Sequence, residues 1–244
     1  MVNSYKKTAF AAALAGCFVA GAADASHFRG GALVPEVDAS GLLTITATTF
    51  WRPTSNGRLG NINIGGAGTS GSFTRDTTDS RFDRVVETYT RQLAGAGTTV
   101  ISDSSCCRVQ GIRNGVSSNT SVNFSLSSTI VWDGVNANTP ILFDFAGVQN
   151  EVVRGANYSQ NLNALSGSGH TLTYDAALND TRFNQPPGFA INAATGEMTI
   201  PSINTATFLD NASGNTGADY YFSGTIKSSD GSLVTLDWLF DSVG

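Results

Sequence analysis

The run DYYFSGTIKSSDGSLVTLDWLFDSV, residues 219–243, decides the fold class that we predict for this chain. Two stretches of alternating apolar and polar residues flank Asp230 and Gly231, and an Asp-Gly pair in this position is a strong signal for a β-hairpin. In the second stretch, apolar side chains occupy one face, Val234, Leu236, Trp238 and Phe240, and polar ones the other, Thr235, Asp237 and Asp241. We therefore expect two paired strands with one face in a core.

The rest of the chain has a similar character. Its 244 residues are 41% hydrophobic and 14% charged, and four glutamates are few for long amphipathic helices. In the run 41–52, Leu43, Ile45 and Ala47 alternate with threonines, as in a strand with one buried face. The predicted fold class is all-β, with further strands expected at 85–89, 98–102, 108–113, 121–127, 140–145, 151–162 and 170–176.

A turn-rich run, VWDGVNANTP at residues 131–140, divides the chain into two predicted domains. The first is an N-terminal β-domain at 26–137, and the second is a domain at 138–244. The second holds about seven short strands separated by turns, which is typical of an immunoglobulin-like sandwich. Two β-sandwich-like domains are therefore expected.

The first 25 residues have the composition of an export signal. Two lysines precede an uncharged apolar stretch, and Ala23-Asp24-Ala25 fits the small-x-small rule, so we expect cleavage after Ala25. The mature protein would then be secreted or displayed on the surface of a bacterium. In the alternative, Leu14-Ala15-Gly16-Cys17 is a lipobox and Cys17 carries a lipid anchor, although no polar tether follows Cys17.

Two adjacent cysteines, Cys106 and Cys107, remain after removal of the signal. An exported chain meets an oxidising environment, so a vicinal disulfide between them is one prediction. The alternatives are that each pairs elsewhere or stays reduced as a buried thiol. Adjacent cysteines lack the ligand spacing of a zinc site.

Several motifs in the second part recur together. The run PPGFAINAATGEMTIP, residues 186–201, follows a Pro-Gly-apolar-x-Asn-x-x-Thr-Gly-x-apolar pattern, and GANYSQNLNA, TLTY and SSDGSLVTLDWLF accompany it. On these motifs, 138–244 resembles the cadherin-like or putative immunoglobulin domains of bacterial surface proteins. The resemblance implies an immunoglobulin-type sandwich over nearly the whole second part.

Calcium binding is one property that this resemblance raises. Cadherin-type versions often carry an acidic Asp-x-Asp-Gly-Asp run before the Leu-Thr-Tyr strand, where this chain has SGSGH, Ser166 to His170, without a carboxylate. Calcium takes six to eight oxygen ligands, usually including several carboxylates. We expect no cofactor, and the remaining calcium candidates are scattered: Asp175, Asp180 and Asp230.

The opening of the mature chain carries a second resemblance. SHFRGGAL, with FWR and CCRV further on, resembles the N-terminal β-domain of secreted multidomain proteins that open on His-Phe-Arg-Gly-Gly. The resemblance transfers no catalytic residues. His and Arg beside an aromatic ring can bind a carboxylate or a sugar, which makes candidates of His27, Arg29, Trp51 and Arg52. In the structural alternative, Phe28 enters the core, Arg29 bonds to turn carbonyls, and Gly30-Gly31 lets strands pass closely.

Charge and histidine content argue against several functions. The formal net charge is −5 without a basic stripe, so nucleic acid is not an expected partner. The mature part has no apolar stretch of membrane-spanning length. A Ser-His-Asp hydrolase would use His170, but no nucleophile elbow accompanies it, and the four glutamates form no obvious glycosidase pair. We therefore expect no enzymatic activity.

The expected function is adhesion or extracellular structure through protein–protein or matrix contacts. Surface proteins, glycans or further copies of the chain would be its partners. The alternative is a carbohydrate-binding module, which needs an exposed aromatic patch, so burial of all three tryptophans, Trp51, Trp132 and Trp238, would count against it. A secreted hydrolase that depends on His170 is the third possibility.

Overall fold

The protein is built almost entirely of strands, as predicted. The computed structural model describes residues 28–53, 55–105, 107–109, 111–116, 123–149, 151–209 and 219–244. It is 53% strand and 4% helix, with antiparallel sheets in a sandwich- or barrel-like arrangement, which confirms the all-β fold class. The predicted export signal, its Cys17, and His27 and Cys106 lie outside the described residues.

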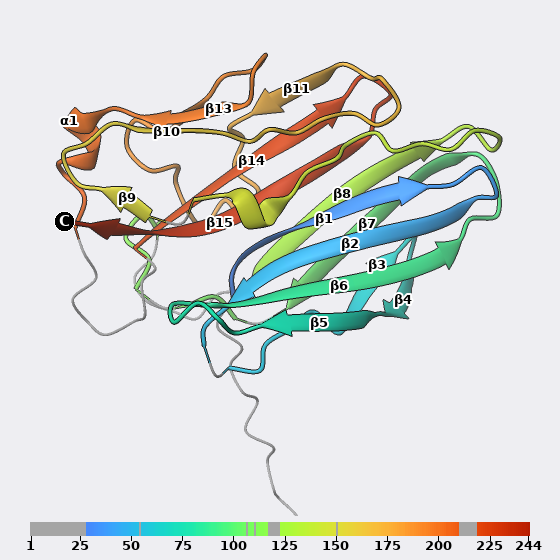
Figure 1. Cartoon of the computed structure of the whole chain (residues 1–244), viewed down its shortest axis with the longest axis horizontal. Coiled ribbons are helices and arrows are strands. Elements are labelled where there is room, and N and C mark those ends of the chain that lie inside the picture. The colour runs from blue at the N-terminus through green and yellow to red at the C-terminus, as the bar shows by residue number, and fades with distance from the viewer. Residues whose placement is uncertain are drawn as a thin grey trace, which may run out of the picture.

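Twelve of the described strands belong to one large sheet (Figure 1). Its hydrogen-bonded path runs β4–β3–β7–β8–β15–β1–β2–β6–β5. In that order the strands span Ala67–Ser70, Asn61–Ile64, Gly97–Ser105, Phe124–Trp132, Leu233–Val243, Phe28–Val37, Leu42–Trp51, Asp83–Gln92 and Ser72–Asp76. Off this path lie three more strands, β14 (Tyr220–Ser228), β11 (Leu172–Asp175) and β9 (Glu151–Val153).

The two end strands of that path are consecutive in the chain. Only Gly71 separates β4 from β5, and these strands pair with β3 and β6 respectively. The path therefore curves back on itself around the first core. Buried side chains from β1, β2, β6, β7 and β8 fill this core, among them Phe28, Leu43, Ile45, Trp51, Ile101 and Phe124.

A small second sheet lies over the C-terminal half. It consists of β10 (Tyr158–Asn161), β13 (Glu197–Ile200) and β12 (Ala190–Ile191), in that order. In Figure 1, β10 and β13 run above the long strands β14 and β15. The space between holds the second core, which includes Tyr158, Met198, Ile200, Phe222, Leu236 and Trp238. Two short helices, η1 (Phe145–Gly147) and α1 (Ser202–Thr205), complete the fold.

The long hairpin predicted for residues 219–243 forms as expected. β14 and β15 pair along their length, and Gly231 has a φ of 94° in the turn between them. The apolar face of β15 packs into the second core. Its polar face is also covered, because Asp237 and Asp241 are buried. The prediction of one buried face was therefore incomplete.

The shared strand β15 connects the two halves of the chain. It pairs with β1 at Gly30 and Trp238 and with β8 at Thr129 and Leu233. The predicted boundary between residues 137 and 138 falls between β8 and η1, where it cuts no strand. One main core lies mostly in each half, but Ala32 and Phe50 of the first half belong to the second core, and one sheet spans both halves. That each half is a domain of its own remains a prediction.

Two segments predicted as strands differ in the structure. Within 108–113, the described residues form no strand, and Arg108 makes only an isolated parallel bridge to Phe28. The run 140–145 has only an isolated bridge from Leu142 to Leu165 before η1 begins. Both runs contain apolar residues, but in both the backbone pairs with other segments for one or two residues only. Within the described ranges, no helix has the length and apolar character needed to cross a membrane.

Candidate functional site

The predicted binding residues near the N-terminus lie in the interior. Trp51 is fully buried, with its ring centroid 5.2 Å from that of Phe28, and its Nε1 donates to Thr49 Oγ1 at 2.8 Å. Arg29 is 3% exposed; its Nη1 donates to the Arg81 carbonyl at 2.6 Å, and its Nη2 lies 3.4 Å from an Asp241 carboxylate oxygen. The burial of Arg29 and Trp51 leaves neither side chain available to a ligand on the surface.

The other two members of that set contribute little to a site. Arg52 is half-buried just after β2, and His27 lies outside the described residues. Cys107 is disulfide-bonded and buried, while its partner cysteine lies outside the described residues. That the partner is Cys106 remains a prediction.

The three calcium candidates lie in separate environments. Asp175 pairs with Lys227 at 3.1 Å on the surface, whereas Asp180 is buried and pairs with Arg182 at 2.7 Å. Asp230 accepts hydrogen bonds in the turn between β14 and β15. Among the described residues, no three His, Cys, Asp or Glu side chains come together in a way that could hold a metal ion.

His170 and Asp230 do come together, in a surface groove. His170 Nε2 lies 3.2 Å from Asn138 Oδ1 and 3.6 Å from Asp230 Oδ2, and Asn138 Nδ2 donates to the same Asp230 oxygen at 2.7 Å. With Asp133 and Ser168, these residues line a cavity of about 300 Å³. The Ser168 hydroxyl accepts from a backbone N–H, that of Thr139, at 2.8 Å. Sequence patterns identified His170 and Asp230 separately but gave no sign of their pairing.

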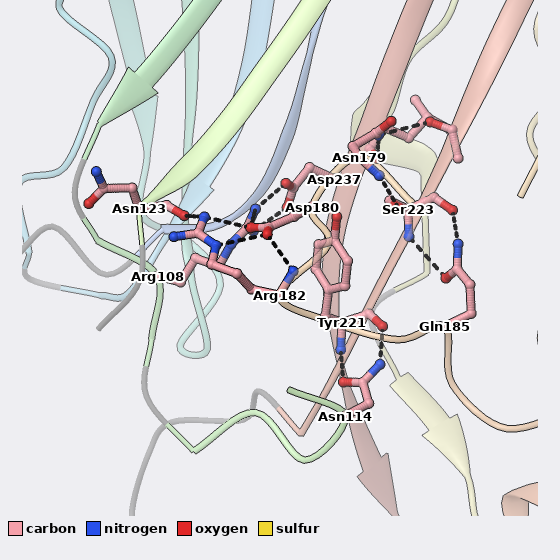
Figure 2. Close-up of polar contacts among 12 residues, drawn as sticks. Arg108, Asn114, Asn123, Asn179, Asp180, Arg182, Gln185, Tyr221, Ser223 and Asp237 are labelled. Carbon is pink, nitrogen blue, oxygen red and sulfur yellow. Dashed lines mark hydrogen bonds and ion pairs between the residues drawn. The ribbon is translucent and has the colours of Figure 1, made fainter. Parts of the chain in front are cut away.

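The most concentrated polar chemistry is buried where the two halves meet (Figure 2). Arg108 and Asp237 are both fully buried, and the two terminal guanidinium nitrogens of Arg108 donate to the two carboxylate oxygens of Asp237. A second carboxylate, that of Asp180, lies 3.7 Å from Arg108 and accepts from Arg182 Nε at 2.8 Å. Two arginines and two aspartates thus alternate in space. Arg108, Asp180 and Asp237 are buried, and the Arg182 side chain, 43% exposed, reaches the surface; we call these four residues the buried ion network.

Aromatic rings surround the central guanidinium of this network. The Arg108 Cζ lies 4.9 Å from the Tyr221 ring centroid, 5.5 Å from that of Phe183 and 5.6 Å from that of Phe28. Contacts of this length are favourable cation–π interactions. Burial lowers the pKa of Arg108, but the charge and hydrogen bonds of Asp237 outweigh it and raise the pKa above the usual value. The arginine is therefore charged, and its carboxylate partner balances that charge.

Beside the network, side-chain amides cover the part of the β14 edge that β11 leaves unpaired. Asn114 accepts from Tyr221 N at 2.9 Å, and Gln185 donates to the Ser223 carbonyl at 2.7 Å and accepts from Ser223 N at 3.3 Å (Figure 2). Asn179 donates to the Gly224 carbonyl at 3.2 Å. These amides take the place of a neighbouring strand. They satisfy backbone groups that an edge strand otherwise leaves open to pairing.

No protein-family model and no curated protein matches this chain. The fold and the contacts within it are therefore the basis for assigning a function.

The buried ion network is suited to holding the halves together. Asp237 on β15 and Asp180 belong to the second half of the chain. Arg108 belongs to the first half, as does Phe28 on β1, with which Arg108 forms an isolated backbone bridge. All the charged groups are paired, and Arg108 and Asp237 have no exposed surface, so neither can meet a soluble substrate. The arrangement supports a structural role and not a catalytic one.

Two other buried acids should make stability depend on pH. Burial raises the pKa of Asp103 and of Asp241 to about 6 in each case. An unfolded aspartate titrates near pH 3.9, so in the interval up to about 6 the folded protein binds more protons than the unfolded chain. The free energy of unfolding should therefore fall as pH rises through this interval. At 1.36 kcal/mol per pK unit, each acid accounts for about 3 kcal/mol.

Urea unfolding at a series of pH values checks this prediction. We expect the wild type to be more stable near pH 5 than near pH 8, and Asp103→Asn to reduce that difference, because the amide carries no charge at either pH. Asp175→Asn is the matched control, since Asp175 lies on the surface beside Lys227. An Asp103→Asn profile parallel to that of the wild type would contradict the assignment.

Proposed function

We propose that this protein is exported and acts outside the cell in adhesion or extracellular structure, through contacts of its surface with proteins or a matrix. The observation that carries this proposal is the chemistry of the outward-facing strand positions. On β2 and β6 these positions carry mainly Thr, Val and Gln, and on β7 and β8 they carry Ser, Thr and Val. Two of the ion pairs, Arg108 with Asp237 and Arg29 with Asp241, are buried, whereas others, such as Lys227 with Asp175, lie at the surface. Such a surface suits broad contact more than chemistry on a small substrate.

Carbohydrate binding has less support from the geometry. Trp51, Trp132 and Trp238 are buried, at 0%, 6% and 1% exposure. Phe73 is the only aromatic side chain in the described ranges that is more than a third exposed. The Arg58 guanidinium lies over its ring at 4.4 Å, so one face of this ring is not free to stack on a sugar.

Contact through faces fits the structure better than strand addition at the edge of β14. β11 pairs with residues 225–228 along that edge, and Asn114, Gln185 and Asn179 bind backbone groups along the rest of it. The proposed export rests on the composition of residues 1–25, and the disulfide at Cys107 is typical of a protein in an oxidising compartment. The mass of the mature protein distinguishes cleavage after Ala25 from lipidation at Cys17.

Display of the mature chain on a carrier bacterium tests the proposal. We expect the displaying cells to clump or to be retained on matrix-coated surfaces, whereas cells with an unrelated β-sandwich are not. Loss of retention on addition of the soluble protein would show that the contact is specific. Displaying cells that behave like the control cells would contradict the proposal. Turnover of ester or glycoside substrates that His170→Ala abolishes would replace it with a hydrolase.

A further inference from the structure

The outer face of β2, β6 and β5 carries hydroxyl side chains in a regular array. In Figure 1 these three strands lie side by side, and their pairing is continuous. Register places outward-facing residues of successive strands directly opposite one another. We call this set the threonine grid; its rows are Thr44 and Thr90, then Thr46, Thr88 and Ser72, then Thr48, Val86 and Thr74.

The spacing of the threonine grid follows from β-sheet geometry. Neighbouring strands lie about 4.8 Å apart, and residues i and i+2 on one strand are about 6.7 Å apart. Seven of the eight positions carry a hydroxyl group, and the eighth is Val86, which has the shape of threonine. Apart from Val86, which lacks the hydroxyl, and Ser72, which lacks the methyl group, the grid repeats both groups in two directions.

The grid hydroxyls are open to water. Five of the eight residues are exposed, and Thr44, Thr48 and Val86 are half-buried. Among the described residues, no protein hydrogen bond engages any of the seven side-chain hydroxyls. Inward-facing neighbours such as Ile45 and Tyr89 are fully buried, so the backbone under the grid is anchored in the first core.

The grid contains no charged, amide or aromatic side chain. Charge begins only in the next row, where Arg84 and Asp76 lie 3.7 Å apart, and at Glu36 on β1 beside Thr44. Phosphate backbones are bound by basic residues and calcium by carboxylates, and neither is present. Stacking on sugars needs aromatic faces, which the grid also lacks. A neutral ligand with its own regular array of hydrogen-bonding groups fits this face better.

We propose that the threonine grid binds the surface of ice. The faces of an ice crystal present water oxygens in rows with repeats comparable to those of the grid. Each threonine hydroxyl can take the place of one lattice water, and each methyl group orders the water beside it. A rigid array gives this binding at low entropic cost, because few side-chain rotamers have to be fixed. This inference goes beyond adhesion to cells or a matrix, and either can fail without the other.

Partition into growing ice tests the inference. The full mature chain is placed in solution around a slowly growing ice front, and the protein in ice is compared with that in the liquid. We expect enrichment in the ice relative to an inert protein of similar size. Thr46→Tyr and Thr88→Tyr should each lose most of this enrichment, because a bulky ring lifts the face away from the lattice. Tyrosine is well tolerated in strands, so folding should persist.

Thr98→Tyr is the matched control, because Thr98 is exposed on β7, outside the grid. It should retain the wild-type enrichment, and thermal unfolding of all three variants establishes that they fold. Exclusion of the wild type from ice to the same extent as the inert protein would overturn the inference, as would equal enrichment of all variants. Sedimentation velocity identifies one rival: if the wild type is excluded from ice and the grid variants alone lose self-association, the face contacts a second copy and the inference is wrong.

Discussion

Replacement of Asp237 by alanine should lower the free energy of unfolding by about 3–5 kcal/mol, or prevent folding altogether. The fully buried Arg108 would lose both of its direct hydrogen-bonded oxygens. Asp180 lies 3.7 Å away and is already paired with Arg182, so it is poorly placed to compensate. An uncompensated charge in the interior is among the most costly defects that a single substitution can introduce.

Two comparisons identify the cause of that loss. Asp175→Ala removes a carboxylate from the exposed pair with Lys227 and should cost less than about 1 kcal/mol. The double variant Arg108→Met/Asp237→Leu removes both charges from the network and should recover much of the stability lost in Asp237→Ala. Urea unfolding measures all three. Equal losses for Asp237→Ala and Asp175→Ala would contradict the role assigned to the buried ion network.

Local pattern predicted the strands because alternation and turn chemistry act over a few residues. Leu43, Ile45 and Ala47 are all fully buried, as their alternation with threonines predicted. The Asp230-Gly231 turn lies between the expected strands. In contrast, the run 151–162 reads as one strand but forms β9 and β10, separated by a turn in which Gly155 has a φ of 73°.

The buried ion network could not be predicted in this way. Asp237 alternates with apolar residues, so the pattern places it on a face open to solvent. Only the tertiary structure shows that Arg108 and its neighbours bury this face. Its partner Arg108 is 129 residues away in sequence, and one chain gives no signal that links the two. For Arg29 and Trp51, the sequence offered a binding site and a structural role as alternatives, and their burial supports the structural role. The residues next to Arg29 in the sequence gave no sign that Asp241, in the second half of the chain, pairs with it.

Substitution of Gly30 by alanine should disrupt the junction between β1 and β15. Gly30 lies opposite Trp238 in this pairing, and a Cβ added to it would be 2.2 Å from Trp238 Cε3 and 2.8 Å from the Asp237 carbonyl oxygen. The indole has little room to move, since the rings of Phe50 and Phe145 each lie 4.8 Å from it, centroid to centroid. Overpacking of a rigid core typically costs 1–3 kcal/mol, and we expect about 3 here because backbone also obstructs the methyl group.

Gly68→Ala is the matched control for this prediction. Nothing lies within 4 Å of a Cβ at Gly68, on the exposed strand β4, so its midpoint of urea unfolding should stay close to that of the wild type. In Gly30→Ala/Trp238→Leu, the smaller side chain makes room for the new methyl group, so the Gly30 substitution should cost less than in the wild-type background. Equal midpoints for Gly30→Ala and Gly68→Ala would show that β1 and β15 can separate without cost. If that were so, the glycines of the SHFRGG opening would not be required by close passage of these strands.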